Sequence, residues 1–78
     1  MSLKETWQAA EKEAKEANRK EDIAYNNKTD ARNIWHRDTH DEHLAEYQYA
    51  IDEYIIARNT AEIKSILAKR ARIELSTD

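Results

Sequence analysis

All the histidines of the chain lie within eight residues near its midpoint: His36, His40 and His43. On one continuous helix, spacings of four and three residues would place their imidazole rings on a single face. Imidazole is a preferred ligand of zinc and nickel, and Asp38 or Asp41 would supply a further oxygen ligand. A metal-binding or metal-sensing helical hairpin, with zinc or nickel as cofactor, is therefore the alternative function that these residues indicate.

The same octapeptide also has the features of a turn between two helices. Thr39 followed three residues later by Glu42 fits a capping box, which starts a helix. Asp41 adds negative charge to the first turn of that helix, whereas His36 and Arg37 would complement the negative end of a preceding helix. A hairpin hinge is the leading interpretation, because a helix break at Thr39 interrupts the face that a metal would need.

Other patterns that carry chemistry are few. The chain has no Cys and no Gly, so it has neither a thiol nucleophile nor a Gly-rich phosphate loop. We expect no enzymatic activity and, for the leading interpretation, no cofactor. The basic cluster from Lys64 to Arg72 is a candidate for phosphate contacts, but the net charge is −3 and the basic residues occupy several helix faces. We therefore do not expect nucleic acid as a partner.

The composition is typical of long helices. The 78 residues include no Gly and no Pro, so the residues that form tight hairpin turns are missing, while Ala, Glu, Lys and Arg are abundant. This length predicts one domain, residues 1–78, of the all-α class. No apolar segment approaches the length of a membrane span, so we expect a soluble, cytoplasmic protein with no membrane partner.

The first predicted helix covers about residues 2–36 and starts with a capping box made by Ser2 and Glu5. One stripe of residues recurs at alternating steps of four and three, which keeps it on one helix face. Its members are Leu3, Trp7, Ala10, Ala14, Ala17, Glu21, Ala24, Lys28, Ala31 and Trp35. The segment from Asn26 to Asp30 has poor helix propensity, and a break there would give a three-helix fold instead.

The second predicted helix covers about residues 40–75 and carries a matching stripe: Leu44, Tyr47, Ile51, Tyr54, Arg58, Ala61, Ser65, Ala68, Arg72 and Leu75. Folding the chain back at the hinge gives an antiparallel helical hairpin in which the numbers of facing residues add up to about 78 or 79. Three polar matches follow: Glu21 with Arg58, Trp7 with Arg72, and Lys28 with Ile51. We interpret them respectively as an ion pair, a cation–π contact and a lysine that must extend toward solvent.

A second apolar stripe on the second helix lies roughly 90° or more around the helix from the first. It consists of Tyr49, Ile56, Ile63 and Leu67. One Ala-rich partner helix cannot cover both faces. The leading interpretation is an interface between copies of the chain, most simply two hairpins in a four-helix bundle, and the alternative is a docking face for a different protein.

Six acidic residues and no basic ones lie between residues 38 and 53: Asp38, Asp41, Glu42, Glu46, Asp52 and Glu53. Tyr47, Tyr49 and Tyr54 lie among or beside them and would add aromatic anchors for a basic partner protein. We therefore add Glu46 and Glu53 to the predicted interface. The predicted function is a non-enzymatic protein-interaction module or regulator, such as an inhibitor or adaptor, that acts as a homo-oligomer.

Overall fold

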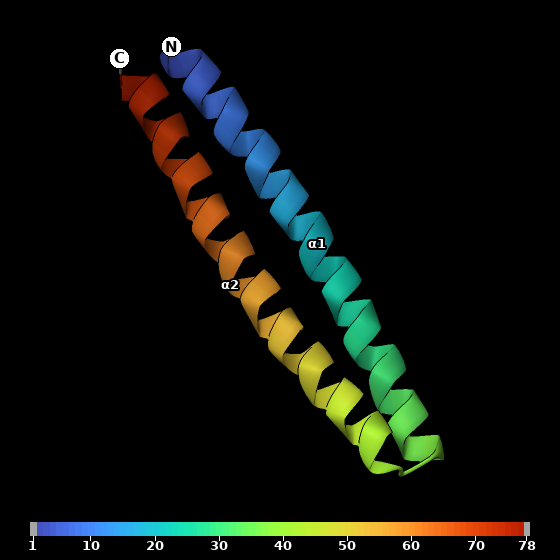
Figure 1. Ribbon diagram of the computed structural model, residues 1–78. Coiled ribbons are helices and arrows are strands. Elements are labelled where there is room, and N and C mark those ends of the chain that lie inside the picture. Colours follow the sequence, from blue (N-terminus) through green and yellow to red (C-terminus); the bar gives the residue numbers. More distant parts are fainter. Residues whose placement is uncertain (1, 78) are drawn as a thin grey trace.

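The protein is described by a computed structural model that covers residues 2–77. It consists of two helices, α1 (Leu3–Arg37) and α2 (Asp41–Thr77). They run antiparallel side by side and are joined by a short turn at one end (Figure 1). The predicted all-α antiparallel hairpin is confirmed, and the helix ends lie within two residues of those expected from the sequence.

Helix α1 begins directly after Ser2, whose side chain caps it. The Ser2 hydroxyl accepts a hydrogen bond from the backbone N–H of Glu5 at 3.1 Å and lies 3.2 Å from the Glu5 carboxylate, to which it donates. This contact satisfies one of the free N–H groups at the helix start, and the acidic side chain is favourable beside the positive end of the helix dipole. The predicted cap is confirmed.

Helix α1 continues without a break from Asn26 to Asp30, so the three-helix alternative is wrong for this chain. The local propensity of that segment is overridden by tertiary contacts. The Lys28 ammonium lies over the rings of Tyr25 and of Tyr54 from α2, and the two tyrosine rings meet edge to face at 5.7 Å. These contacts exist only if residues 25 and 28 occupy consecutive turns of one helix.

Helix α2 begins at Asp41 and not at the capping box predicted from Thr39. The backbone carbonyl of His40 accepts the first helical hydrogen bonds, from the N–H groups of His43 at 3.0 Å and Leu44 at 3.2 Å. Within residues 2–77 no hydrogen bond joins the side chains of Thr39 and Glu42. The chain uses residues 38–40 to reverse its direction, which moves the helix start beyond Thr39.

The contact between the helices, here called the seam, is built mainly from small residues. Its buried members are all alanines: Ala14, Ala17, Ala61, Ala68 and Ala71. Every residue of the predicted α1 stripe from Trp7 to Trp35 is buried or half-buried. Alanine lets the helices approach closely, but it removes little apolar surface from water, so the seam supplies a small hydrophobic stabilisation.

Three contacts across the seam fix its register. The rings of Tyr25 and Tyr54 touch, the rings of Trp35 and Tyr47 stack at 5.9 Å, and the Lys64 ammonium lies 3.2 Å from the Glu13 carboxylate. The residue numbers of these pairs add up to 79, 82 and 77, around the predicted sum of 78 or 79.

The hairpin is a rod with dimensions of 58 × 16 × 13 Å. Its radius of gyration is 17.3 Å, whereas a compact domain of this length would have one of roughly 12 Å. Its accessible surface of 6094 Å² exceeds by about 1,200 Å² the roughly 4,900 Å² expected for a folded monomer of 9.2 kDa. Among residues 2–77, neither helix is sufficiently long and apolar to cross a membrane.

Candidate functional site

The surface of α2 that points away from α1 carries a concentration of exposed apolar side chains. Seven large apolar residues of α2 are exposed: Tyr49, Ile55, Ile56, Ile63, Ile66, Leu67 and Ile73. The most exposed are Tyr49 at 67% and Ile56 and Ile73 at 61% each. Isolated exposed apolar residues are ordinary, but a continuous run along one helix marks a contact surface.

The most exposed members follow the same alternation of steps as the seam. We call this stripe the outer face, and it consists of Tyr49, Asp52, Ile56, Asn59, Ile63, Ile66, Arg70 and Ile73. Steps of three and four residues keep it straight along a supercoiled helix, as in the contact stripe of a coiled coil. Helix α2 therefore carries large apolar residues on two opposite stripes, and only one of the stripes faces α1.

The outer face includes three of the predicted interface residues, Tyr49, Ile56 and Ile63, all of which are exposed. Leu67 is 43% exposed and lies at the edge of the stripe, where Glu46 and Glu53 are also exposed. Sequence reasoning missed Ile66 and Ile73. The signal was present, because these two residues continue the alternation of steps beyond Ile63, but the prediction followed one row of the helix surface only.

A shallow apolar pocket of about 320 Å³ borders the outer face near the middle of the rod. Tyr49 and Glu53 of α2 line it together with Ile23 of α1, which is 46% exposed. The apolar surface of α2 thus extends sideways onto one residue of α1.

The expected aromatic anchors of the acidic segment are only partly available. Tyr47 and Tyr54 are half-buried in the seam, where they contact Trp35 and Tyr25. Only Tyr49 presents most of its side chain to solvent, at 67% exposure. The expectation of three tyrosine anchors for a basic partner is wrong, because the α2 stripe that packs on α1 uses two of them.

The predicted polar matches across the seam have mixed outcomes. Lys28, which was predicted to extend toward solvent, is half-buried, and its ammonium lies 4.8 Å and 4.5 Å from the ring centroids of Tyr25 and Tyr54. The ion pair predicted between Glu21 and Arg58 is absent, and the Arg58 guanidinium lies 6.0 Å from the Tyr54 ring centroid instead.

The predicted contact of Trp7 with Arg72 is also absent from the cation–π contacts within residues 2–77. Arg58 and Arg72 are both exposed, while the preceding alanines, Ala57 and Ala71, are half-buried and buried. The seam is rotated by about one residue at these two positions, because an alanine allows close helix packing and an arginine retains its hydration in solvent.

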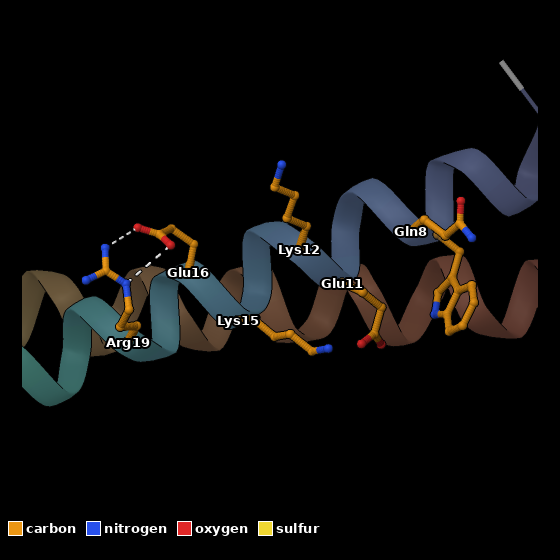
Figure 2. A pocket seen from close by; sticks show the side chains of 7 residues that line it. Gln8, Glu11, Lys12, Lys15, Glu16 and Arg19 are labelled. Atoms are coloured by element: carbon orange, nitrogen blue, oxygen red, sulfur yellow. Dashed lines mark hydrogen bonds and ion pairs between the residues drawn. The ribbon is translucent and has the colours of Figure 1, made fainter.

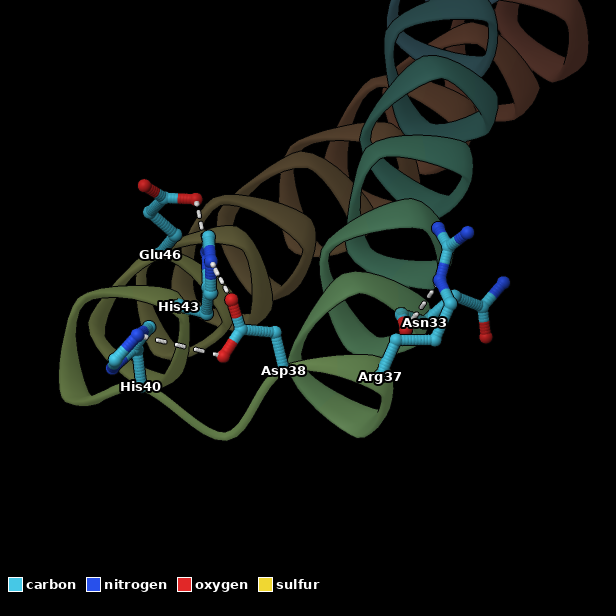
Figure 3. Close-up of polar contacts among 6 residues, drawn as sticks. All are labelled: Asn33, Arg37, Asp38, His40, His43 and Glu46. Carbon is cyan, nitrogen blue, oxygen red and sulfur yellow. Dashed lines mark hydrogen bonds and ion pairs between the residues drawn. The ribbon is translucent and has the colours of Figure 1, made fainter.

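At the hinge, the Asp38 carboxylate lies close to the rings of two of the three histidines, His40 and His43 (Figure 3). One Asp38 carboxylate oxygen lies 3.7 Å from His40 Nε2 and the other lies 3.4 Å from His43 Nε2. The second ring nitrogen of His43, Nδ1, is 3.7 Å from the Glu46 carboxylate and makes no hydrogen bond. These contacts close the turn between α1 and α2.

His36 does not join this cluster by any ion pair, and its ring lies against that of Trp35 at 5.1 Å. Because residues 38–40 are not helical, the three histidines do not lie on one continuous helix. In the part of the chain that the structure describes, no three His, Cys, Asp or Glu side chains are arranged to hold a metal ion. The metal site remains a prediction, which a zinc titration followed by calorimetry would test.

A pocket of about 530 Å³ lies along the N-terminal half of α1, beside Trp7. Figure 2 shows the side chains along it: Gln8, Glu11, Lys12, Lys15, Glu16 and Arg19. Arg19 is paired with Glu16, and the hydrogen bond and charge of Arg19 lower the pKa of the Glu16 carboxyl. The other charged groups point in different directions and do not converge on one ligand position, so this pocket is a weaker candidate than the outer face.

No protein family, no curated protein and no solved structure matches this chain.

Proposed function

We propose that the protein is a helical protein-interaction module or regulator that acts as a homo-oligomer, and that the outer face of α2 is its contact surface. The observation that carries this proposal is the exposed run of large apolar residues on a helix whose opposite side already packs on α1. In water such a run is stabilised by burial against another protein surface.

The amount of exposed surface supports self-association. The hairpin exposes about 1,200 Å² more than a compact monomer of its mass, and a standard interface buries roughly 800 Å² on each partner. The alanine seam provides little stability by itself, and a chain of this size without disulfides gains stability when binding is coupled to folding. A second hairpin bound to the outer face would cover exposed apolar surface and would also stabilise the folded hairpin.

Sedimentation equilibrium of the purified chain tests this proposal. We expect a dimer or larger species at about 50 μM, and a monomer for the variant Ile56→Glu/Ile63→Glu, because two carboxylates would be buried in the interface. The control is Ile34→Glu, which introduces one carboxylate at an exposed isoleucine of α1 and should leave the association unchanged, whereas Ile56→Glu alone, with the same change of charge, should weaken it. A wild-type chain that remains monomeric at 50 μM would refute the proposal.

A further inference from the structure

We infer that a second copy of the chain occupies the outer face in antiparallel orientation, with α2 against α2 and the two α1 helices outermost. This inference rests on the proposed function and adds the orientation and register of the pair. It follows from two properties of α2, the spacing of the outer face and the division of the helix into an acidic and a basic half.

The outer face is complementary to itself when it is reversed. An antiparallel pair with its two-fold axis beside residue 61 brings together Tyr49 with Ile73, Asp52 with Arg70, and Ile56 with Ile66. Every facing pair then adds up to 122, so each step of three residues faces a step of three and each step of four faces a step of four, and the two stripes stay in register along the whole contact. The five most exposed large side chains of α2 all enter this contact.

The charges of α2 favour the antiparallel orientation over the parallel one. Residues 41–57 contain acids and no Lys or Arg, whereas residues 58–72 contain five basic residues and one acid, Glu62. A parallel pair would place like halves together, and an antiparallel pair places opposite halves together. Within the outer face itself, Asp52 and Arg70 are the only charged residues, and this register pairs them in both halves of the dimer.

Two less favourable layers lie beside the axis. Asn59 faces Ile63, and Glu62 approaches its own copy at the flank of the contact. A polar residue in such a stripe lowers stability while it restricts the register. The like-charge approach of Glu62 gives a distinct signature, since its neutralisation should strengthen the dimer.

Two other arrangements are competing outcomes. Shifting the pair by one heptad would bring Glu62 opposite Lys69 and leave Asp52 outside the contact, so that Glu62→Gln would weaken the dimer. A compact four-helix bundle would instead bury the side of the hairpin, including Ile23 next to Tyr49. The proposed pair leaves Ile23 in solvent.

Disulfide cross-linking tests the orientation directly, because the natural chain has no cysteine. An equimolar mixture of the Ile56→Cys and Ile66→Cys chains should form a mixed disulfide dimer, while neither chain alone should cross-link efficiently. A parallel pair would give the opposite result, efficient linking of Ile56→Cys with itself. Helicity measured on each variant verifies folding, which both exposed positions should preserve.

A charge exchange tests the register. Asp52→Arg alone and Arg70→Asp alone should each weaken dimerisation by roughly tenfold or more, and the double exchange should restore it. In one chain these residues are 18 positions apart, or roughly 27 Å along the helix, so their coupling must arise between chains. Glu62→Gln should strengthen the dimer, and Ile23→Lys should not change it.

The outcomes separate this inference from the function on which it rests. A monomeric wild-type chain would refute the proposed function. A wild-type dimer that links Ile56→Cys to itself, or in which the charge exchange gives no recovery, or in which Ile23→Lys abolishes association, would refute only the antiparallel outer-face pair.

Discussion

Truncation of Ile63 to alanine should have little effect on the stability of the protein at low concentration and a large one at high concentration. Ile63 lies in the middle of the outer face and is 58% exposed in the hairpin. In a dilute monomer rather less than half of its side chain is buried, whereas in the proposed dimer the remaining exposed part would be removed from water.

The structure sets the size of both effects. Full burial of an isoleucine contributes about 1.5–3 kcal/mol, and rather more than half of this is still available in the hairpin. For two copies, after discounting the carbon that alanine retains, we expect a loss of about 2 kcal/mol of association free energy, or about 30-fold in Kd. In the monomer, the better helix propensity of alanine, roughly 0.4 kcal/mol, is offset by loss of the part of the Ile63 side chain that is already buried, so Tm at low concentration should change by no more than about 3 °C.

The assay is thermal unfolding followed by circular dichroism at 222 nm over a 1,000-fold range of protein concentration. Tm of the wild type should rise with concentration, and the curve for Ile63→Ala should start close to it and fall further below it as the concentration increases. Ile34→Ala is the matched control, because Ile34 is an exposed isoleucine of α1, and its curve should remain parallel to that of the wild type.

Parallel curves for Ile63→Ala and the wild type would refute the reasoning, since they would show that Ile63 remains in solvent at every concentration. A steeper concentration dependence for Ile63→Ala would contradict it equally.

Three further predictions concern the hairpin itself. Ala61 is 3% exposed at the centre of the seam, so Ala61→Leu should destabilise the protein by about 1–3 kcal/mol in urea unfolding, while Ala45→Leu at an exposed position should change it by less than about 0.5 kcal/mol. Ser2→Ala removes the cap of α1 and should cost about 1 kcal/mol in the same assay, and Ser2→Asp should retain most of the stability. Lys28→Gln removes the ammonium from the rings of Tyr25 and Tyr54 and should cost about 0.5–1 kcal/mol, an effect that should become smaller in a Tyr54→Leu background and disappear when Tyr25→Leu is added.

The sequence predicted the fold nearly completely because two independent signals agreed. The chain has no Gly and no Pro and carries long stripes of regularly spaced residues, which left few alternatives to a helical hairpin. The Ser2 cap could be predicted because it depends on local sequence only, and tertiary contacts do not disturb it. The poor helix propensity of residues 26–30 wrongly indicated a possible helix break, because Lys28 is stabilised by contacts with Tyr25 and Tyr54, which lie on two different helices.

The details of the seam could not be predicted from a fixed spacing. A rotation of α2 by a fraction of a turn turns Arg58 and Arg72 toward solvent and brings Ala57 and Ala71 into the seam. Which of these residues packs on α1 depends on how closely the two backbones can approach. The first residue of α2 could not be predicted from the local sequence either. The capping box at Thr39 is a typical helix start, but Thr39 lies in the turn of residues 38–40 that reverses the chain, so the helix begins after it. At the candidate site, the exposed fractions of Ile66 and Ile73 showed that these residues belong to the outer face, which the prediction from one row of the helix surface had missed.

The position of the chain ends allows fluorescent labels to measure how two copies of the protein are oriented. Helix α1 begins and α2 ends at the same end of a rod 58 Å long, and the hinge lies at the other (Figure 1). Fluorescent labels at Ser2 and Thr77 would therefore remain neighbours within one hairpin, whereas a label at the hinge would lie almost the whole length of the rod away. In the antiparallel pair, the end-labelled tips of the two rods would point in opposite directions, so energy transfer between chains would report the orientation of the pair in solution.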